Sequence, residues 1–139
     1  MPLESELTFF LDRNLGSQIV PQALRAAGWV LETMDERYGI DESKLIQDVQ
    51  WIEEATLAGE VLLTKDVRIA KNPLEATAVY QTSARVFALA SGMLTGPEMA
   101  TWFLAGEKPI RRMAAHAGGP YVAAVRLGHN LRRLTLNHL

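Results

Sequence analysis

Two short apolar runs that each lead into an aspartate constrain the fold of this chain more than any other feature. The first run spans residues 7–11 and stops at Asp12, and the second spans residues 61–64 and stops just before Asp66. Segments of helical periodicity lie between them. Strands that alternate with helices are typical of a parallel sheet covered on both faces. We therefore expect an α/β fold of three layers, with a small, mostly parallel sheet between two layers of helices.

Local signals set the expected bounds of the other elements. Gly28 and Gly59 close two helical patterns, and Thr95 and Glu98 have the spacing of a capping box. The expected strands cover residues 7–11, 29–34, 61–64, 86–89 and 121–125, and residues 35–39 are expected to form a loop. The expected helices run from a Ser17 cap to Ala27, from about Leu45 to Gly59, and from Thr95 to about Leu104.

The length and residue types limit both the domain count and the kinds of metal site. A chain of 139 residues with 48% hydrophobic residues fits one domain, residues 1–139, with a single core. The absence of cysteine excludes disulfides and thiolate ligands. The three histidines lie late in the chain without the spacing of a helical zinc site. Carboxylates are the remaining ligands, and they suit Mg²⁺ or Mn²⁺.

Charge and hydropathy bear on the partners and location of the chain. No stretch approaches the roughly 18 apolar residues of a membrane helix, and the start lacks the basic region of a signal peptide. We therefore expect a cytoplasmic protein with no membrane segment. The net charge is −2, yet no acid follows Arg111. A solvated tail that offsets an acidic body and a surface facing RNA or a partner both explain this arrangement. The basic residues concerned are Arg111, Arg112, Arg126, Arg132 and Arg133.

Three aspartates are the candidates for chemistry. The carboxyl ends of neighbouring parallel strands meet at one edge of a sheet, so we expect Asp12 and Asp66 to lie together. Asp48 begins the helix that leads into the second of these strands. Clustered carboxylates raise one another's pKa unless a cation neutralises them, which points to a divalent ion. For each aspartate, helix capping or simple solvation is the alternative.

The spacing of these residues resembles a known family. Asp12-Arg13-Asn14 is similar to the D-x-N motif that opens PIN domains, and Thr64-Lys65-Asp66 is similar to their later T-x-D motif. Asp48, Ala55 and Gly59 match the compact PIN-like branch, in which an aspartate opens a helix and a glycine precedes the next strand. The resemblance covers residues 9–66 and is carried by the order and spacing of the motifs together.

The resemblance implies a metal-dependent endoribonuclease of the VapC type, the toxin of a type II toxin–antitoxin pair. It implies that Asp12, Asp48 and Asp66 hold Mg²⁺ or Mn²⁺ and activate water, with Asn14 and Thr64 as supporting groups. The arginines after residue 110 would contact RNA phosphates. The implied partners are an RNA substrate and a cognate antitoxin, and a homodimer is a further possibility. A groove for the antitoxin is expected around Met93, Met99, Trp102, Phe103 and Met113, with core packing as the alternative.

The sequence also departs from the family pattern. Arg68 stands where a further acid is common, and Asp35, Glu53 and Glu75 are equal candidates for a fourth carboxylate. A catalytically inactive PIN fold that serves as a binding module is therefore the main alternative. Aspartyl phosphotransferases use D-x-D after the first strand, where this chain has Asn14. Receiver-like domains need paired acids there, and Arg13 follows Asp12.

Overall fold

The computed structural model describes residues 3–139, and one six-stranded sheet runs through this part of the chain. Its strand order is β2-β1-β3-β4-β5-β6, and all neighbouring strands are parallel except β6, which is antiparallel to β5. The expected α/β architecture is confirmed. The strands are β1 (Thr8–Leu11), β2 (Val30–Thr33), β3 (Val61–Thr64), β4 (Arg85–Leu89), β5 (Tyr121–Val125) and β6 (Arg132–Arg133).

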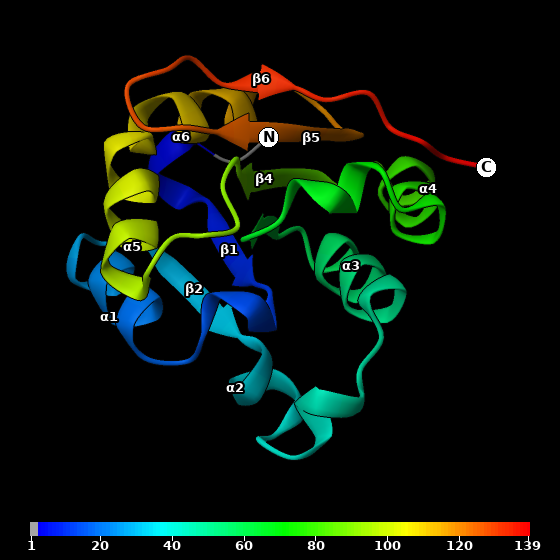
Figure 1. The fold of residues 1–139 in the computed structure, drawn as a ribbon, viewed down its shortest axis with the longest axis horizontal. Coiled ribbons are helices and arrows are strands. Elements are labelled where there is room, and N and C mark those ends of the chain that lie inside the picture. The colour runs from blue at the N-terminus through cyan, green and yellow to red at the C-terminus, as the bar shows by residue number, and fades with distance from the viewer. Residues whose placement is uncertain (1–2) are drawn as a thin grey trace.

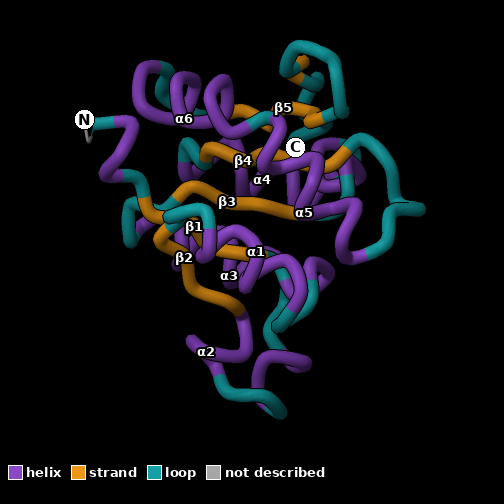
Figure 2. The backbone as a smooth tube through the Cα atoms, turned by 90° about the vertical axis from the view of Figure 1, so that its left-hand side faces the viewer, coloured by secondary structure: helices purple, strands orange, loops and turns teal. Residues whose placement is uncertain are grey.

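Helices cover both faces of the sheet (Figures 1 and 2). On one face lie α1 (Ile19–Ala26), α5 (Gly96–Ala105) and α6 (Glu107–His116), and on the other lie α3 (Asp48–Leu57) and α4 (Pro73–Thr82). A short helix, α2 (Met34–Tyr38), follows β2 at the sheet edge. The single turns of 3₁₀ helix are η1 (Glu4–Glu6), η2 (Arg13–Leu15), η3 (Glu42–Leu45) and η4 (Val67–Ala70).

Alternating side chains of the strands divide the core into two layers. In β1, Phe9 and Leu11 pack toward α1 and α5, whereas Phe10 packs toward α3, as the period of two in a strand requires. All three side chains are fully buried. Strands buried on both faces are the reason that the sequence shows continuous apolar runs rather than alternation.

Three local expectations were wrong. Residues 35–38 belong to a helix, α2, because Thr33 and Glu36 form a capping box at its start, and Gly39 ends it. Leu45 is exposed in η3, and the helix expected from there begins at Asp48. No side chain caps α1, so Ser17 does not act as its cap. The helix α4 and the strand β6 lie outside the expected set. Among residues 3–139, no helix has the length and apolar character needed to cross a membrane.

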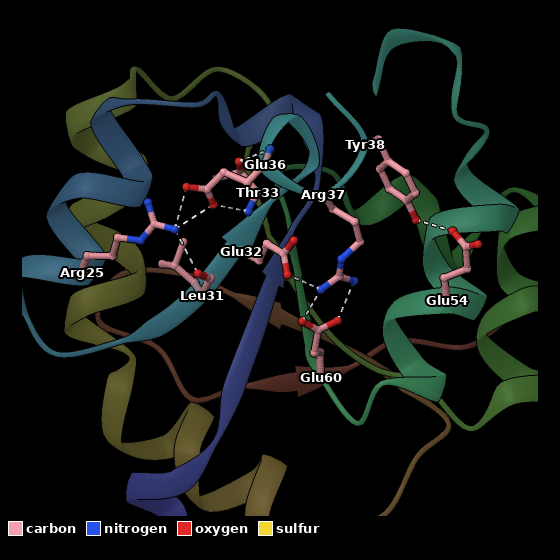
Figure 3. A network of polar contacts seen from close by, with 9 residues as sticks. All are labelled: Arg25, Leu31, Glu32, Thr33, Glu36, Arg37, Tyr38, Glu54 and Glu60. Atoms are coloured by element: carbon pink, nitrogen blue, oxygen red, sulfur yellow. Dashed lines mark hydrogen bonds and ion pairs between the residues drawn. The ribbon is translucent and has the colours of Figure 1, made fainter. Parts of the chain in front are cut away.

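A polar network fixes α2 to the sheet (Figure 3). The guanidinium of Arg37 donates to both carboxylate oxygens of Glu60, at 2.7 and 2.6 Å, and to Glu32 at 2.6 Å. It also lies 4.2 Å from the centre of the Phe10 ring. Tyr38, the last residue of α2, donates to Glu54 on α3. The short helix is thus held by charge as well as by apolar packing.

Candidate active site

Asp12 follows β1 directly and is bound to the neighbouring strand β3. Its N–H donates to the carbonyl of Leu63 at 2.9 Å, and the hydroxyl of Thr64 donates to its Oδ2 at 2.8 Å. The amide of Asn14 donates to the same hydroxyl at 3.1 Å and accepts from the N–H of Lys65 at 3.1 Å. The pairing of β1 with β3 therefore brings the two predicted motifs into one hydrogen-bonded unit.

Asp48 is the first residue of α3, and its carboxylate is oriented by an indole. Trp51 lies one turn along the helix, and its Nε1 donates to Oδ1 of Asp48 at 2.9 Å. The rest of the Trp51 side chain is buried among core residues, which excludes a role in stacking on bases. Trp51 thus combines core packing with the positioning of a candidate metal ligand.

Asp66 precedes η4 and forms a close pair with Arg68. Its Oδ1 accepts from the N–H of Arg68 at 2.8 Å, and its Oδ2 accepts from the guanidinium Nε at 2.6 Å. The side-chain hydrogen bond from Arg68 lowers the pKa of Asp66 below its ordinary value. Arg68, which stands where PIN-like domains commonly have an acid, therefore binds the carboxylate of Asp66, one of the three predicted aspartates.

Glu75 on α4 faces the same group of carboxylates. Burial, followed by the charges of Asp48 and Asp12, raises its pKa from 4.5 to about 7. Asp35, one of the other two candidates for a fourth acid, instead accepts a hydrogen bond from Ser43 at 2.6 Å and lines a different cavity. Of the three candidates, Glu75 is the one that lines the cavity of the predicted aspartates.

The sequence does contain a signal for the position of Glu75. Asn72-Pro73-Leu74-Glu75 is a helix start, since the Asn72 side chain accepts from the N–H of Leu74 at 3.1 Å and proline opens the helix. Reading this start would have predicted α4 and placed Glu75 in its first turn. Its distance from the aspartates depends on tertiary packing, which no local pattern specifies.

The pKa of Asp12 is raised from 3.8 to about 6. Burial is the largest cause, and the hydrogen bond from Thr64 opposes it, while the charge of Asp48 adds to it. The ionised forms of Asp12 and Glu75 are thus less favoured than those of free carboxyl groups, and a nearby cation would favour them.

One cavity of about 410 Å³ unites these groups at the carboxyl ends of β1 and β3. Its volume lies within the usual range of ligand sites. The structure brings Asp12, Asp48 and Asp66 together with the supporting residues Asn14 and Thr64. The full lining is Asp12, Arg13, Asn14, Asp48, Thr64, Asp66, Arg68, Ile69, Asn72 and Glu75.

The chemistry of these donors fits Mg²⁺ or Mn²⁺. Four carboxylates with amide and hydroxyl groups beside them form an all-oxygen set, which hard divalent cations prefer. Asp12 and Glu75 have raised pKa values, and a bound cation would lower them. Within residues 3–139, however, no three acidic or histidine side chains already stand in the arrangement of a metal site. The carboxylate of Asp66 is at the same time paired with the guanidinium of Arg68.

The predicted RNA-binding arginines fall into separate places. Arg111 donates to Glu107 and to the carbonyl of Glu4. Glu4 precedes β1 whereas Asp12 follows it, so Arg111 lies at the opposite end of the strands from Asp12. Its neighbour Arg112 is exposed on the same helix. Arg133 lies over the ring of Tyr121 at 4.9 Å, at the start of β5. The remaining two, Arg126 and Arg132, line a second cavity at the carboxyl ends of β4 and β5.

The residues named for an antitoxin groove differ in their exposure. Phe103 and Met99 are buried in the core, and Trp102 and Met113 pack partly buried against it. Met93 is exposed but belongs to the loop before α5. Core packing is therefore the role of Met99 and Phe103, because α5 turns its apolar side toward the sheet.

Comparison with known proteins agrees with this geometry. A family model described as "PIN like domain" matches residues 7–91, a range that contains every residue lining the acidic cavity. The chain belongs to the PIN-like domain family. This PIN-like chain is also 35% identical over 116 residues to a Mycobacterium tuberculosis (strain ATCC 25618 / H37Rv) protein named "Putative ribonuclease VapC45". The match covers 84% of this chain and 83% of that protein. No solved structure matches the chain.

Proposed function

We propose that this PIN-like protein is a metal-dependent endoribonuclease and the toxin of a type II toxin–antitoxin pair. The observation that carries the proposal is the gathering of Asp12, Asp48, Asp66 and Glu75 around one cavity at the strand ends. Similarity to a protein named as a VapC ribonuclease supports the choice of RNA as the substrate class. By the same similarity, a cognate antitoxin and a cytoplasmic location belong to the proposal.

The four carboxylates would hold one or two ions of Mg²⁺ or Mn²⁺. When bound, the metal polarises the phosphodiester and makes a water molecule more acidic. Thr64 and Asn14 orient the carboxylate of Asp12 through their shared hydrogen bonds, and Trp51 orients Asp48. Such supporting hydrogen bonds tune the affinity and geometry of a metal site.

Glu75 has a separate part in this proposal. With a pKa of about 7, its carboxyl group exchanges a proton near neutral pH. Without a cation, burial and the charges of Asp48 and Asp12 favour its protonated form, which limits repulsion among the carboxylates. Glu75 lines the cavity of the three aspartates, and in its ionised form it would be the fourth ligand of a bound cation, at a site where Arg68 stands in place of a further acid.

The test is cleavage of RNA by the purified protein with Mg²⁺ or Mn²⁺ supplied and with EDTA as the metal-free control. The proposal predicts cleavage only with metal, and complete loss of it in Asp12→Asn, whose side chain keeps its shape but loses its charge. Internal scission of an RNA circle would establish the endonuclease class. Cleavage that persists in EDTA, or in Asp12→Asn at the parent rate, would contradict the proposal.

An inactive PIN fold that serves as a binding module remains the second candidate, and one observation favours it. The carboxylate of Asp66, which an active site would need, is paired with Arg68. An inactive module predicts no rise in melting temperature with Mn²⁺, whereas ligand binding to the folded state must raise it by mass action.

A further inference from the structure

A second cavity of about 330 Å³ lies at the carboxyl ends of β4 and β5. Ala90 and Arg126 line it immediately after these strands, and Arg132 of β6 lines it opposite Ala124. No acidic residue contributes to its wall. The full lining is Val67, Lys71, Ala90, Ala124, Arg126, His129, Asn130, Arg132 and Leu134.

The basic side chains of this cavity are unpaired. Within residues 3–139, the side chains of Lys71, Arg126, His129 and Arg132 make no hydrogen bond or ion pair. By contrast, Arg37 is bound to two glutamates. The side chains of Lys71, Arg126 and Arg132 are exposed and place charges of one sign around this hollow, which would attract an anion.

The basic cavity adjoins the acidic one across a single turn of chain. Val67 of η4 lines the basic cavity, while the next two residues, Arg68 and Ile69, line the acidic cavity. In the same way, Lys71 lines the basic cavity and the next residue, Asn72, lines the acidic cavity. Both hollows also lie at the edge where parallel strands end, so one extended ligand can reach both.

The C-terminal segment holds the wall of the basic cavity in place. Leu134 donates to the carbonyl of Val122, and Asn137 donates from its backbone and side chain to the carbonyls of Ala70 and Lys71, each at 2.9 Å. Figure 1 shows this segment running from β6 past β5 to α4. The cavity is therefore part of the fold, with Val67, Ala90, Ala124 and Leu134 as its apolar floor.

We propose that the basic cavity binds the backbone of the RNA strand beside the bond that is cut, with phosphate at the cationic rim and a ribose or an unstacked base on the apolar floor. This inference rests on the proposed ribonuclease function and adds a substrate subsite to it. An RNA strand presents phosphates and flat apolar bases together. Most residues of the basic cavity lie beyond the family match, which covers residues 7–91. These are Ala124, Arg126, His129, Asn130, Arg132 and Leu134.

The experiment measures binding of a short fluorescent single-stranded RNA by anisotropy in EDTA, where no metal is present to support cleavage. Arg126→Ala and Arg132→Ala are compared with the parent and with Lys108→Ala, a control that removes one exposed charge from α6. Each subsite variant should bind more weakly and lower the slope of log affinity against log salt by about 0.7, the value for one lost phosphate contact with a single strand. The control should keep the parent slope.

Cleavage kinetics with Mn²⁺ separate this inference from the proposed function. The subsite variants should raise KM for RNA and leave kcat near the parent value, because they remove binding that the ground state and transition state share.

If the parent cleaves RNA and both variants match it in affinity, salt slope and KM, the proposed subsite is wrong although the ribonuclease function stands. If the parent does not cleave but the variants lose RNA affinity, the function fails and the RNA site remains. Variants that lose affinity for polyglutamate but not for RNA would overturn the subsite in favour of an acidic protein partner.

Discussion

Asp12 and Glu75 bind their protons more tightly in the folded protein than free carboxyl groups do, with pKa values of about 6 and about 7 against 3.8 and 4.5. The folded state therefore binds more protons than the unfolded state between these values. By linkage, the metal-free protein should lose stability as the pH rises from about 4 to about 7. The double variant Asp12→Asn/Glu75→Gln should lack this loss and melt at a higher temperature than the parent at pH 7. Melting curves in EDTA across this range measure it, and parallel curves for the two proteins would refute it.

Arg68 competes for the carboxylate of Asp66 with any metal ion. The variant Arg68→Ala removes the hydrogen bonds from the guanidinium to Oδ2, while the backbone N–H of residue 68 still reaches Oδ1. Asp66 stays ionised at neutral pH, since its pKa returns only to the ordinary range. We expect the Mn²⁺ concentration for half-maximal cleavage to fall in this variant and to stay unchanged in Lys108→Ala. An unchanged or higher Mn²⁺ requirement in Arg68→Ala would mean that the ion pair does not restrain the site.

At the scale of the elements, Arg37 supplies the ion pairs that tie α2 to the sheet. Arg37 pairs with Glu60, whose side chain is 9% exposed. By contrast, Arg25 pairs with Glu36, and their side chains are 41% and 45% exposed. Arg37→Ala leaves a nearly buried carboxylate without its cation and should lower the free energy of unfolding by about 2–3 kcal/mol, below the full cost for a wholly buried pair. Arg25→Ala should cost less than about 1 kcal/mol. Urea denaturation of both variants gives the comparison, and equal losses would show that burial of Glu60 does not matter.

The same elements show what a sequence can and cannot predict. The strands β1 and β3 are apolar runs buried on both faces, and this pattern placed them to within a residue. The helix α2 has a clear capping signal in Thr33 and Glu36, but its five residues carry too few apolar positions to show helical periodicity. The strand β6 has two exposed arginines and owes its conformation to pairing with β5. Its position is set by tertiary contacts that the local sequence does not encode.

At the scale of the whole molecule, the candidate site follows from topology. Adjacent parallel strands β1 and β3 put Asp12 beside Thr64 although 52 residues separate them, and the helices α3 and α4 add Asp48 and Glu75. The order of the motifs predicted that the three aspartates lie together, and all three line one cavity. Their role as metal ligands stays a prediction. The sequence named Glu75 as one of three candidates for a fourth acid but did not choose among them, and it did not predict the ion pair at Asp66. Both depend on how side chains pack around a shared cavity.

The toxin proposal makes a prediction in cells. Induced expression of the parent chain without any antitoxin should arrest bacterial growth, because an unopposed ribonuclease degrades RNA that the cell needs. Expression of Asp12→Asn to the same level should be harmless. Colony counts after induction, with protein levels matched by immunoblot, provide the measurement. Normal growth with the parent chain, or arrest with both, would argue against toxicity through the acidic site.

The central claim is that four carboxylates in one cavity hold a divalent metal, and calorimetric titration with Mn²⁺ tests it most directly. The parent protein should bind Mn²⁺ with one or two ions per chain. Asp12→Asn and Asp66→Asn should lose this binding, and Glu75→Gln should weaken it. Glu42→Gln removes an exposed carboxylate outside the cavity and should bind as the parent does. If the parent binds no Mn²⁺, or if Asp12→Asn binds it with the parent affinity and stoichiometry, the metal site proposed for this fold is contradicted.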